Sequence, residues 1–217
     1  MCKICRREYD ENTTELRLSG CRKLTAIPSD LVSLQQLDCS NFIRLTTIPV
    51  LPSLQSLDCS YCSDLTTIPV LLSLQRLYFH DCPKLTTIPE LASLQMLYCY
   101  NCPMLTTVPV LVSLQTLSLD KCRMMATIPV LASLQSLYCD ECPMLTAIFG
   151  DLEALRWFYY NNCPNLVRIP TVTQNLMPRY MYNEIQERLA LKQREISAEL
   201  VPQFYPEIAA LIAEYVL

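Results

Sequence analysis

Apolar residues recur along most of this chain in one pattern with a period of 20 residues. The stretch that starts at Leu51 reads LPSLQSLDCSYCSDLTTIPV, and the blocks that start at Leu71, Leu91, Leu111 and Leu131 repeat it almost letter for letter. A fixed period of this size is the sequence signature of a solenoid, in which one structural unit is stacked on copies of itself. We therefore expect a repeat solenoid whose function is carried on the surface of the stack.

Each repeat contains a segment in which apolar and polar residues alternate. Alternation puts every second side chain on the same side of an extended chain, so this segment predicts a short strand. Stacked strands would form a parallel, concave sheet over a leucine core. The TTIP half of each repeat is rich in β-branched residues and proline, which predicts an extended or polyproline-like convex side. One inward column should close the core on that side: Ile27, Ile48, Ile68, Ile88, Val108, Ile128, Ile148 and Ile169.

The chain contains 13 cysteines and one histidine, and the repeat accounts for most of the cysteines. One column holds Cys39, Cys59, Cys99 and Cys139, and a second column, three places later, holds Cys21, Cys62, Cys82, Cys102, Cys122, Cys142 and Cys163. Since both columns fall on the core side, we interpret them as reduced thiols that pack as small apolar groups, and we expect no bound metal. Cys2 and Cys5 lie outside the repeat and are interpreted as part of an N-terminal cap, with half of a zinc site as the alternative.

The repeat LQxLxCxxCPxLTTIPxLxS resembles the leucine-rich repeat, whose core is LxxLxL followed by an Asn or Cys and a further Leu. The resemblance is densest at Leu54, Leu57, Cys59, Cys62 and Leu65 and their equivalents in the other units. In its length, the 20-residue repeat is similar to the short repeats of bacterial effectors, and in its cysteines it is similar to repeats of large DNA viruses. It implies a leucine-rich-repeat solenoid of about eight repeats over residues 13–170, preceded by a cap segment at 1–12 and followed by a helical cap or tail at 171–217.

Composition narrows the expected function to protein binding. The formal net charge is −4 and Lys and Arg are scattered, which argues against nucleic acid and anionic membranes as partners. The N-terminus lacks the apolar segment of a secretory signal, and no apolar run is long enough to span a membrane, so we expect a cytoplasmic location. With two glycines and no histidine beside a nucleophile, we expect no enzyme activity, no catalytic residues and no cofactor. The partner is an unknown protein, and the chain itself is expected to be a monomer or weak dimer.

Outward positions of the predicted strands differ from repeat to repeat and include many aromatic residues. Tyr, Trp and Arg on a rigid surface are the usual anchors of protein interfaces. The predicted partner-binding residues are Asp38, Asp58, Arg76, Tyr78, His80, Tyr98, Tyr100, Tyr138, Trp157 and Tyr159. For any single tyrosine, the alternative is that its ring only covers the sheet.

The sequence changes character after Pro170. Residues 178–200 have an amphipathic helical pattern, and a second helix is predicted to begin at Pro206. Both are interpreted as a helical cap on the last repeat. Alternatively, YPEIAALIAEYVL resembles the opening helix of an F-box, which would make the chain a substrate receptor of a ubiquitin ligase. The adaptor-binding residues of that alternative are Pro206, Ile208, Leu211, Ile212 and Tyr215.

Overall fold

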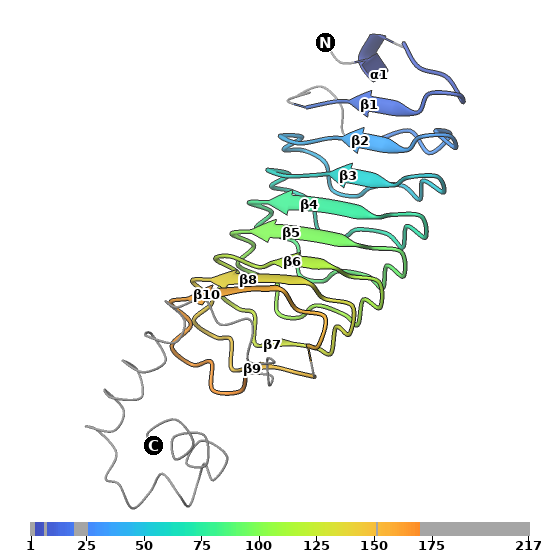
Figure 1. The fold of residues 1–217 in the computed structure, drawn as a ribbon. Helices are drawn as coiled ribbons and strands as arrows, with labels where there is room; N and C mark the ends of the chain where they lie inside the picture. The colour runs from blue at the N-terminus through green and yellow to red at the C-terminus, as the bar shows by residue number, and fades with distance from the viewer. Residues whose placement is uncertain (1–2, 7, 20–25, 151, 170–217) are drawn as a thin grey trace, which may run out of the picture. The chain divides into compact units, whose positions relative to one another are not determined.

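The computed structural model describes residues 3–6, 8–19, 26–150 and 152–169. A short helix, α1 (Lys3–Arg6), precedes a parallel sheet of eight strands in the order β1-β2-β3-β4-β5-β6-β8-β10 (Figure 1). These strands are β1 (Glu15–Arg17), β2 (Gln36–Asp38), β3 (Ser56–Asp58), β4 (Arg76–His80), β5 (Met96–Tyr100), β6 (Thr116–Ser118), β8 (Ser136–Asp140) and β10 (Trp157–Asn161). The predicted parallel β-solenoid is confirmed for this part of the chain.

The sheet register follows the sequence period directly. Leu57 pairs with Leu77 and Leu97 pairs with Leu117, each 20 residues further on. Because equivalent residues lie side by side on neighbouring strands, every position of the repeat becomes a column that runs across the sheet. The chemistry of a column can therefore be read from the sequence one period at a time.

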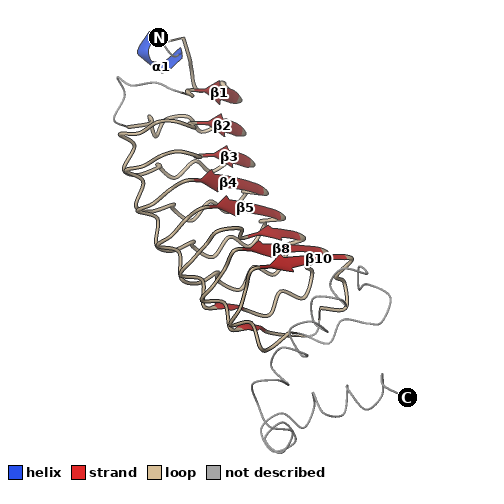
Figure 2. Ribbon diagram, turned by 90° about the vertical axis from the view of Figure 1, so that its left-hand side faces the viewer, coloured by secondary structure: helices blue, strands red, loops and turns tan. Residues whose placement is uncertain are grey.

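The rest of each repeat is extended and contains no helix within the described ranges. A second sheet there has two short strands, β7 (Thr127–Ile128) and β9 (Ala147–Ile148), and Thr47 and Thr67 form an isolated bridge. Figure 2 shows the large sheet along one side of the stack and mainly loops along the other. This agrees with the low helix propensity expected of the TTIP segments.

Columns of branched residues fill the core between the two sides. The strands show alternating burial, as in β8, where Leu137 and Cys139 are buried and their neighbours are partly exposed. Leucines from successive turns are fully enclosed, among them Leu54, Leu74 and Leu94. Removal of this apolar surface from water is the main favourable contribution to folding.

The second cysteine column forms hydrogen bonds between turns, a role that the sequence interpretation missed. The Sγ atoms of Cys62 and Cys82 donate to the carbonyl oxygens of Cys39 and Cys59, both at 3.2 Å. Three further contacts of this kind join Cys102 to Phe79 at 3.2 Å, Cys142 to Leu119 at 3.0 Å and Cys163 to Cys139 at 3.0 Å. An unpaired buried carbonyl is costly, so these thiols satisfy backbone groups as well as filling space.

In the large sheet, the turn after each strand from β2 to β10 contains one residue in the left-handed region. These residues are Asn41, Tyr61, Asp81, Asn101, Lys121, Glu141 and Asn162, with φ between 51° and 61°. This conformation lets backbone hydrogen bonds between neighbouring turns continue beyond the end of the strand. For example, Asp81 N donates to Tyr100 O at 2.8 Å. Asn and Asp tolerate it well, whereas Tyr61, Lys121 and Glu141 carry strain of about 1–2 kcal/mol each.

The C-terminal predictions lie outside the described residues. The chain divides into a unit at Met1–Leu176 and a second unit at Met177–Leu217, none of which is described. The helical cap and Pro206, Ile208, Leu211, Ile212 and Tyr215 therefore stay predictions, as does any role for Cys2. In the part that is described, no helix has the length and apolar character needed to cross a membrane.

The buried thiols predict a loss of stability in alkaline solution. Burial raises the pKa of Cys82 from 9.0 to about 12, and it also raises the pKa of Cys59 and of Cys99 well above the usual value for a thiol. In the unfolded chain these groups ionise near pH 9, so above that pH the unfolded state binds fewer protons than the folded state. Their stabilising contribution is complete below about pH 8 and is lost as the pH rises from about 9 to 12, by about 1.4 kcal/mol per pH unit for each thiol.

Urea unfolding in reducing buffer between pH 8 and pH 11 measures this loss. Cys82→Ala is the matched control. It should be less stable at pH 8, and its free energy of unfolding should fall with pH less steeply, because one ionising thiol fewer contributes to the slope. Parallel profiles for the two proteins would contradict the assignment of Cys82 as a protonated, buried thiol.

Candidate interaction surface

The outward side chains of the eight-stranded sheet form one continuous surface, which we call the strand face. Three columns make it up. The first column is Glu15, Gln36, Ser56, Arg76, Met96, Thr116, Ser136 and Trp157; the middle column is Arg17, Asp38, Asp58, Tyr78, Tyr98, Ser118, Tyr138 and Tyr159; the third column is Ser40, Ser60, His80, Tyr100, Asp120, Asp140 and Asn161. All ten residues predicted to bind a partner lie on this surface, and none points into the core.

Tyrosine rings occupy the centre of the strand face. The rings of Tyr78 and Tyr98 are stacked, with centroids 5.3 Å apart and planes 7° apart. Ser118 interrupts the row on β6, and Tyr138 and Tyr159 continue it on β8 and β10. Burial, together with the neighbouring Tyr78 and Tyr138, raises the pKa of Tyr98, so its hydroxyl is neutral at physiological pH.

A second aromatic group lies along the third column. His80 meets Tyr100 edge-on, with ring centroids 6.4 Å apart at 70°. Lys121 Nζ lies 5.1 Å from the centroid of the Tyr100 ring and 3.6 Å from Glu141 Oε1. The pKa of Lys121 is raised, first by its side-chain hydrogen bond with Tyr100 and then by the charge of Glu141. These contacts restrain the Tyr100 ring, whose exposed edge remains at the surface.

Only some of the hydrogen-bonding groups of His80 have a partner among the described residues. Its backbone N–H donates to Ser60 Oγ at 3.2 Å, and Ser60, the preceding residue of the third column, is buried. Its ring Nδ1 is buried and has no hydrogen-bond partner among the described residues. Since this nitrogen has neither a carboxylate nor a nucleophile beside it, the geometry favours a packing role for the ring.

Carboxylates lie at two places beside the tyrosine row. Toward the N-terminus, Asp38 and Asp58 each accept a hydrogen bond through Oδ1 from the backbone N–H two residues on, at 3.0 Å. They line a hollow of about 320 Å³ on β1 to β4. Toward the C-terminus, Asp120 Oδ1 accepts the backbone N–H of Asp140 at 2.8 Å, and burial raises the pKa of Asp140.

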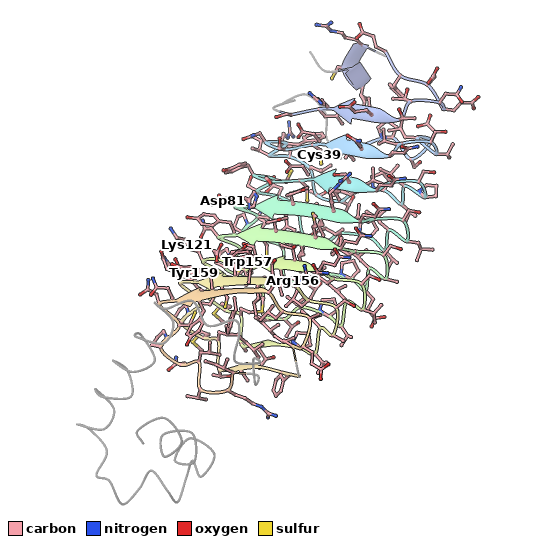
Figure 3. The ribbon with its side chains drawn as sticks, viewed as in Figure 1. Cys39, Asp81, Lys121, Arg156, Trp157 and Tyr159 are labelled. Atoms are coloured by element: carbon pink, nitrogen blue, oxygen red, sulfur yellow. The ribbon has the colours of Figure 1, made fainter. Side chains whose placement is uncertain are left out.

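The last strand presents the most exposed large aromatic side chain of the strand face. Trp157 is 65% exposed on β10, beside Arg156 in the preceding loop (Figure 3). The same strand carries Tyr159 two residues further on. An indole with a neighbouring guanidinium is typical of interface anchors. Trp157 therefore extends the aromatic surface to the C-terminal edge of the sheet.

Two features of the surface were not predicted from the sequence. Lys121 lies in the turn after β6 and was not expected to reach Tyr100 on the neighbouring strand. The hollow depends on the relative lengths of side chains on four strands. The sequence of one repeat does not indicate how these side chains combine. Within the described ranges, no group of three His, Cys, Asp or Glu side chains is arranged to hold a metal ion.

The fold and surface define the class as a parallel β-solenoid repeat protein with a mixed aromatic and acidic strand face. No family model matches the chain, and no curated protein matches it. Matching solved structures include a leucine-rich repeat protein from Bacteroides ovatus, with 19% identity over 71% of this chain and 57% of that chain and a TM-score of 0.36.

Another match is the functional domain of InlJ from Listeria monocytogenes, described as including a cysteine ladder. It has 18% identity over 73% of this chain and 46% of that chain, with a TM-score of 0.25. The chain thus spans about half the length of these two solved proteins.

The stacked pair at the centre of the strand face predicts a measurable coupling energy. Tyr78→Ser and Tyr98→Ser introduce the residue that Ser118 already supplies in the same column, so both variants should fold. In a double-mutant cycle followed by urea unfolding, the pair should show about 0.5–1.5 kcal/mol of coupling. Tyr78 with Tyr138, which lie on strands that are not neighbours, is the matched control and should show almost none. Equal coupling in the two cycles would contradict a specific ring contact.

Proposed function

We propose that this chain is a non-enzymatic protein-interaction module that binds a protein or an extended peptide on its strand face. The observation that carries the proposal is the row of outward Tyr78, Tyr98 and Tyr138 rings on a regular sheet. Inward positions of the same strands are almost uniform in the sequence, whereas the outward positions change from turn to turn. Variation confined to the outward side favours a surface adapted to a particular partner.

The strand face has the physical properties of an interface that is formed before binding. Tyrosine offers a large contact area with few rotatable bonds, so it loses little entropy when it docks. Here Tyr78 and Tyr98 already restrain each other by stacking, and Tyr100 is restrained by Lys121 and His80. Eight strands at about 4.8 Å spacing give a surface roughly 35 Å wide, enough for a peptide or for one face of a folded partner.

The sequence resemblance to short cysteine-type leucine-rich repeats supports the same proposal. Repeat proteins of this kind present an extended surface that suits binding rather than catalysis. The described thiol columns and the 20-residue register agree with that resemblance. We also propose a cytoplasmic location, since buried thiols suit a reducing compartment. A viral or effector origin is proposed on the repeat pattern alone.

Substitution of the tyrosine row tests the proposal. A partner obtained by affinity purification from the native cell should bind the Tyr78→Ser/Tyr98→Ser/Tyr138→Ser variant at least about 30-fold more weakly in calorimetry, since interface anchors contribute about 2 kcal/mol or more. Val50, Val70 and Val110 are exposed outside the strands, and their replacement by serine is the matched control. Unchanged affinity in the tyrosine variant, or an equal loss in the valine variant, would show that the partner binds elsewhere.

The alternative of a ubiquitin-ligase substrate receptor rests on the pattern from Tyr205 to Leu217, which the structure does not describe. In that case the strand face would hold the substrate and the C-terminal helices would hold the adaptor. Co-purification with a cullin adaptor, lost on deletion of residues 203–217, is the expected result for that function. If the deletion leaves every captured protein in place, the alternative is wrong.

A further inference from the structure

The hollow at the N-terminal half of the strand face is framed by side chains of unequal length. Its lining runs from Arg17 on β1 to Tyr78 on β4 and includes the short side chain of Ser56 between them. Its volume of about 320 Å³ is at the small end of the range for ligand pockets and would accommodate one or two side chains of a partner. The shape therefore suits a single protruding residue.

The hollow carries negative charge that the described residues do not neutralise. Asp38 and Asp58 lie directly opposite each other in the parallel register of β2 and β3. Like charges in this arrangement repel. Arg17, the basic residue of the lining, is the register partner of Asp38, but its Nε lies 2.8 Å from Glu15 Oε1. No ion pair within the described ranges includes Asp38 or Asp58, and the lining holds three carboxylates to one guanidinium. A cation supplied by a partner would remove this repulsion.

An aromatic wall adjoins the two carboxylates. Tyr78 is the register partner of Asp58 and lines the hollow. On its other side, toward β5, its ring stacks on Tyr98. A cation over the free face of a tyrosine ring is attracted by the π electrons, and more strongly when carboxylates lie beside it. The lining offers too few ligands for a metal ion, since no group of three metal-binding side chains occurs in the described part.

Among organic cations, a guanidinium matches this arrangement best. It is planar, so it can stack on Tyr78, and it carries several N–H groups that can donate to both carboxylates. The Oδ1 atoms of Asp38 and Asp58 accept local backbone N–H groups, so each carboxylate has a second oxygen for a partner's donor. An ammonium group would satisfy the charge but not the planar stacking.

We propose that the hollow formed by Asp38, Asp58 and Tyr78 binds an arginine side chain of the partner. This inference rests on the proposed function and names the chemistry of one anchor of the bound segment. That segment runs across the strand face with its arginine over β2 to β4 and its next anchor residues toward Tyr98 and Tyr138. The arginine sets the position of the segment along the stack.

Selection of a random displayed peptide library on the full chain supplies a probe. Selected peptides that depend on the strand face should be enriched in arginine, and replacing that arginine by neutral, isosteric citrulline should weaken binding about 10- to 100-fold in fluorescence anisotropy. On Asp38→Asn/Asp58→Asn the two peptides should bind equally. Asparagine keeps the oxygen that accepts the Ser40 and Ser60 N–H groups, so this variant should fold.

Two controls separate the possible outcomes. Asp120→Asn/Asp140→Asn removes carboxylates of the third column, beside β6 and β8, and should leave the discrimination against citrulline intact. A discrimination that persists in Asp38→Asn/Asp58→Asn, or selected peptides without basic residues, would overturn the arginine site while leaving the proposed function in place.

Tyr98→Ser/Tyr138→Ser keeps every residue that lines the hollow and tests the proposed function separately. If no selected peptide loses affinity for this variant, binding to the tyrosine row is wrong, whatever happens at the hollow. As a second readout, raising the salt concentration should weaken the arginine peptide more than the citrulline peptide. Equal salt dependence would contradict the charged contact.

Discussion

The constant register between successive turns is the constraint on which the rest of this structure depends. A residue on one strand lies beside its equivalent on the next, so backbone N–H and C=O groups pair along the whole stack. The thiols of Cys62, Cys82 and Cys102 add hydrogen bonds to carbonyls of the preceding turn. A shift of one residue within a strand would break leucine packing, backbone pairing and the thiol contacts together. The one extra residue between β8 and β10 lies outside the strands, and both the strand pairing and the contact of Cys163 with Cys139 are kept.

Because of this register, the inward and outward positions of each strand are constrained to different degrees. Inward positions have little freedom because each side chain contacts its own equivalents above and below, and the leucine columns are accordingly uniform. Outward positions are free to vary without loss of the core. The strand face therefore combines Asp38 and Asp58, the stacked Tyr78 and Tyr98 and the exposed Trp157 on one regular support.

The alternating pattern was sufficient to predict the strands, their parallel order and the outward positions of Tyr78, Tyr98, Tyr138 and Tyr159. The period of two within a strand decides which side chains face outward, and the period of 20 decides which strands are neighbours. The left-handed turns were not predicted, since Tyr61 and Glu141 have no special preference for that conformation and the register imposes it. The contact of Lys121 with Tyr100 and the hollow beside Asp58 were also missed. Both arise from side chains on different turns whose lengths happen to be complementary.

Site-specific photo-crosslinking tests most directly whether the strand face is the surface that a partner occupies. A photoreactive amino acid can replace Met96, which lies on the strand face beside the tyrosine row, or Met124, which is 49% exposed in a connecting segment outside the sheet. The account predicts that the residue at position 96 captures the bound partner and that the residue at position 124 does not. Capture at position 124 with none at position 96 would contradict it.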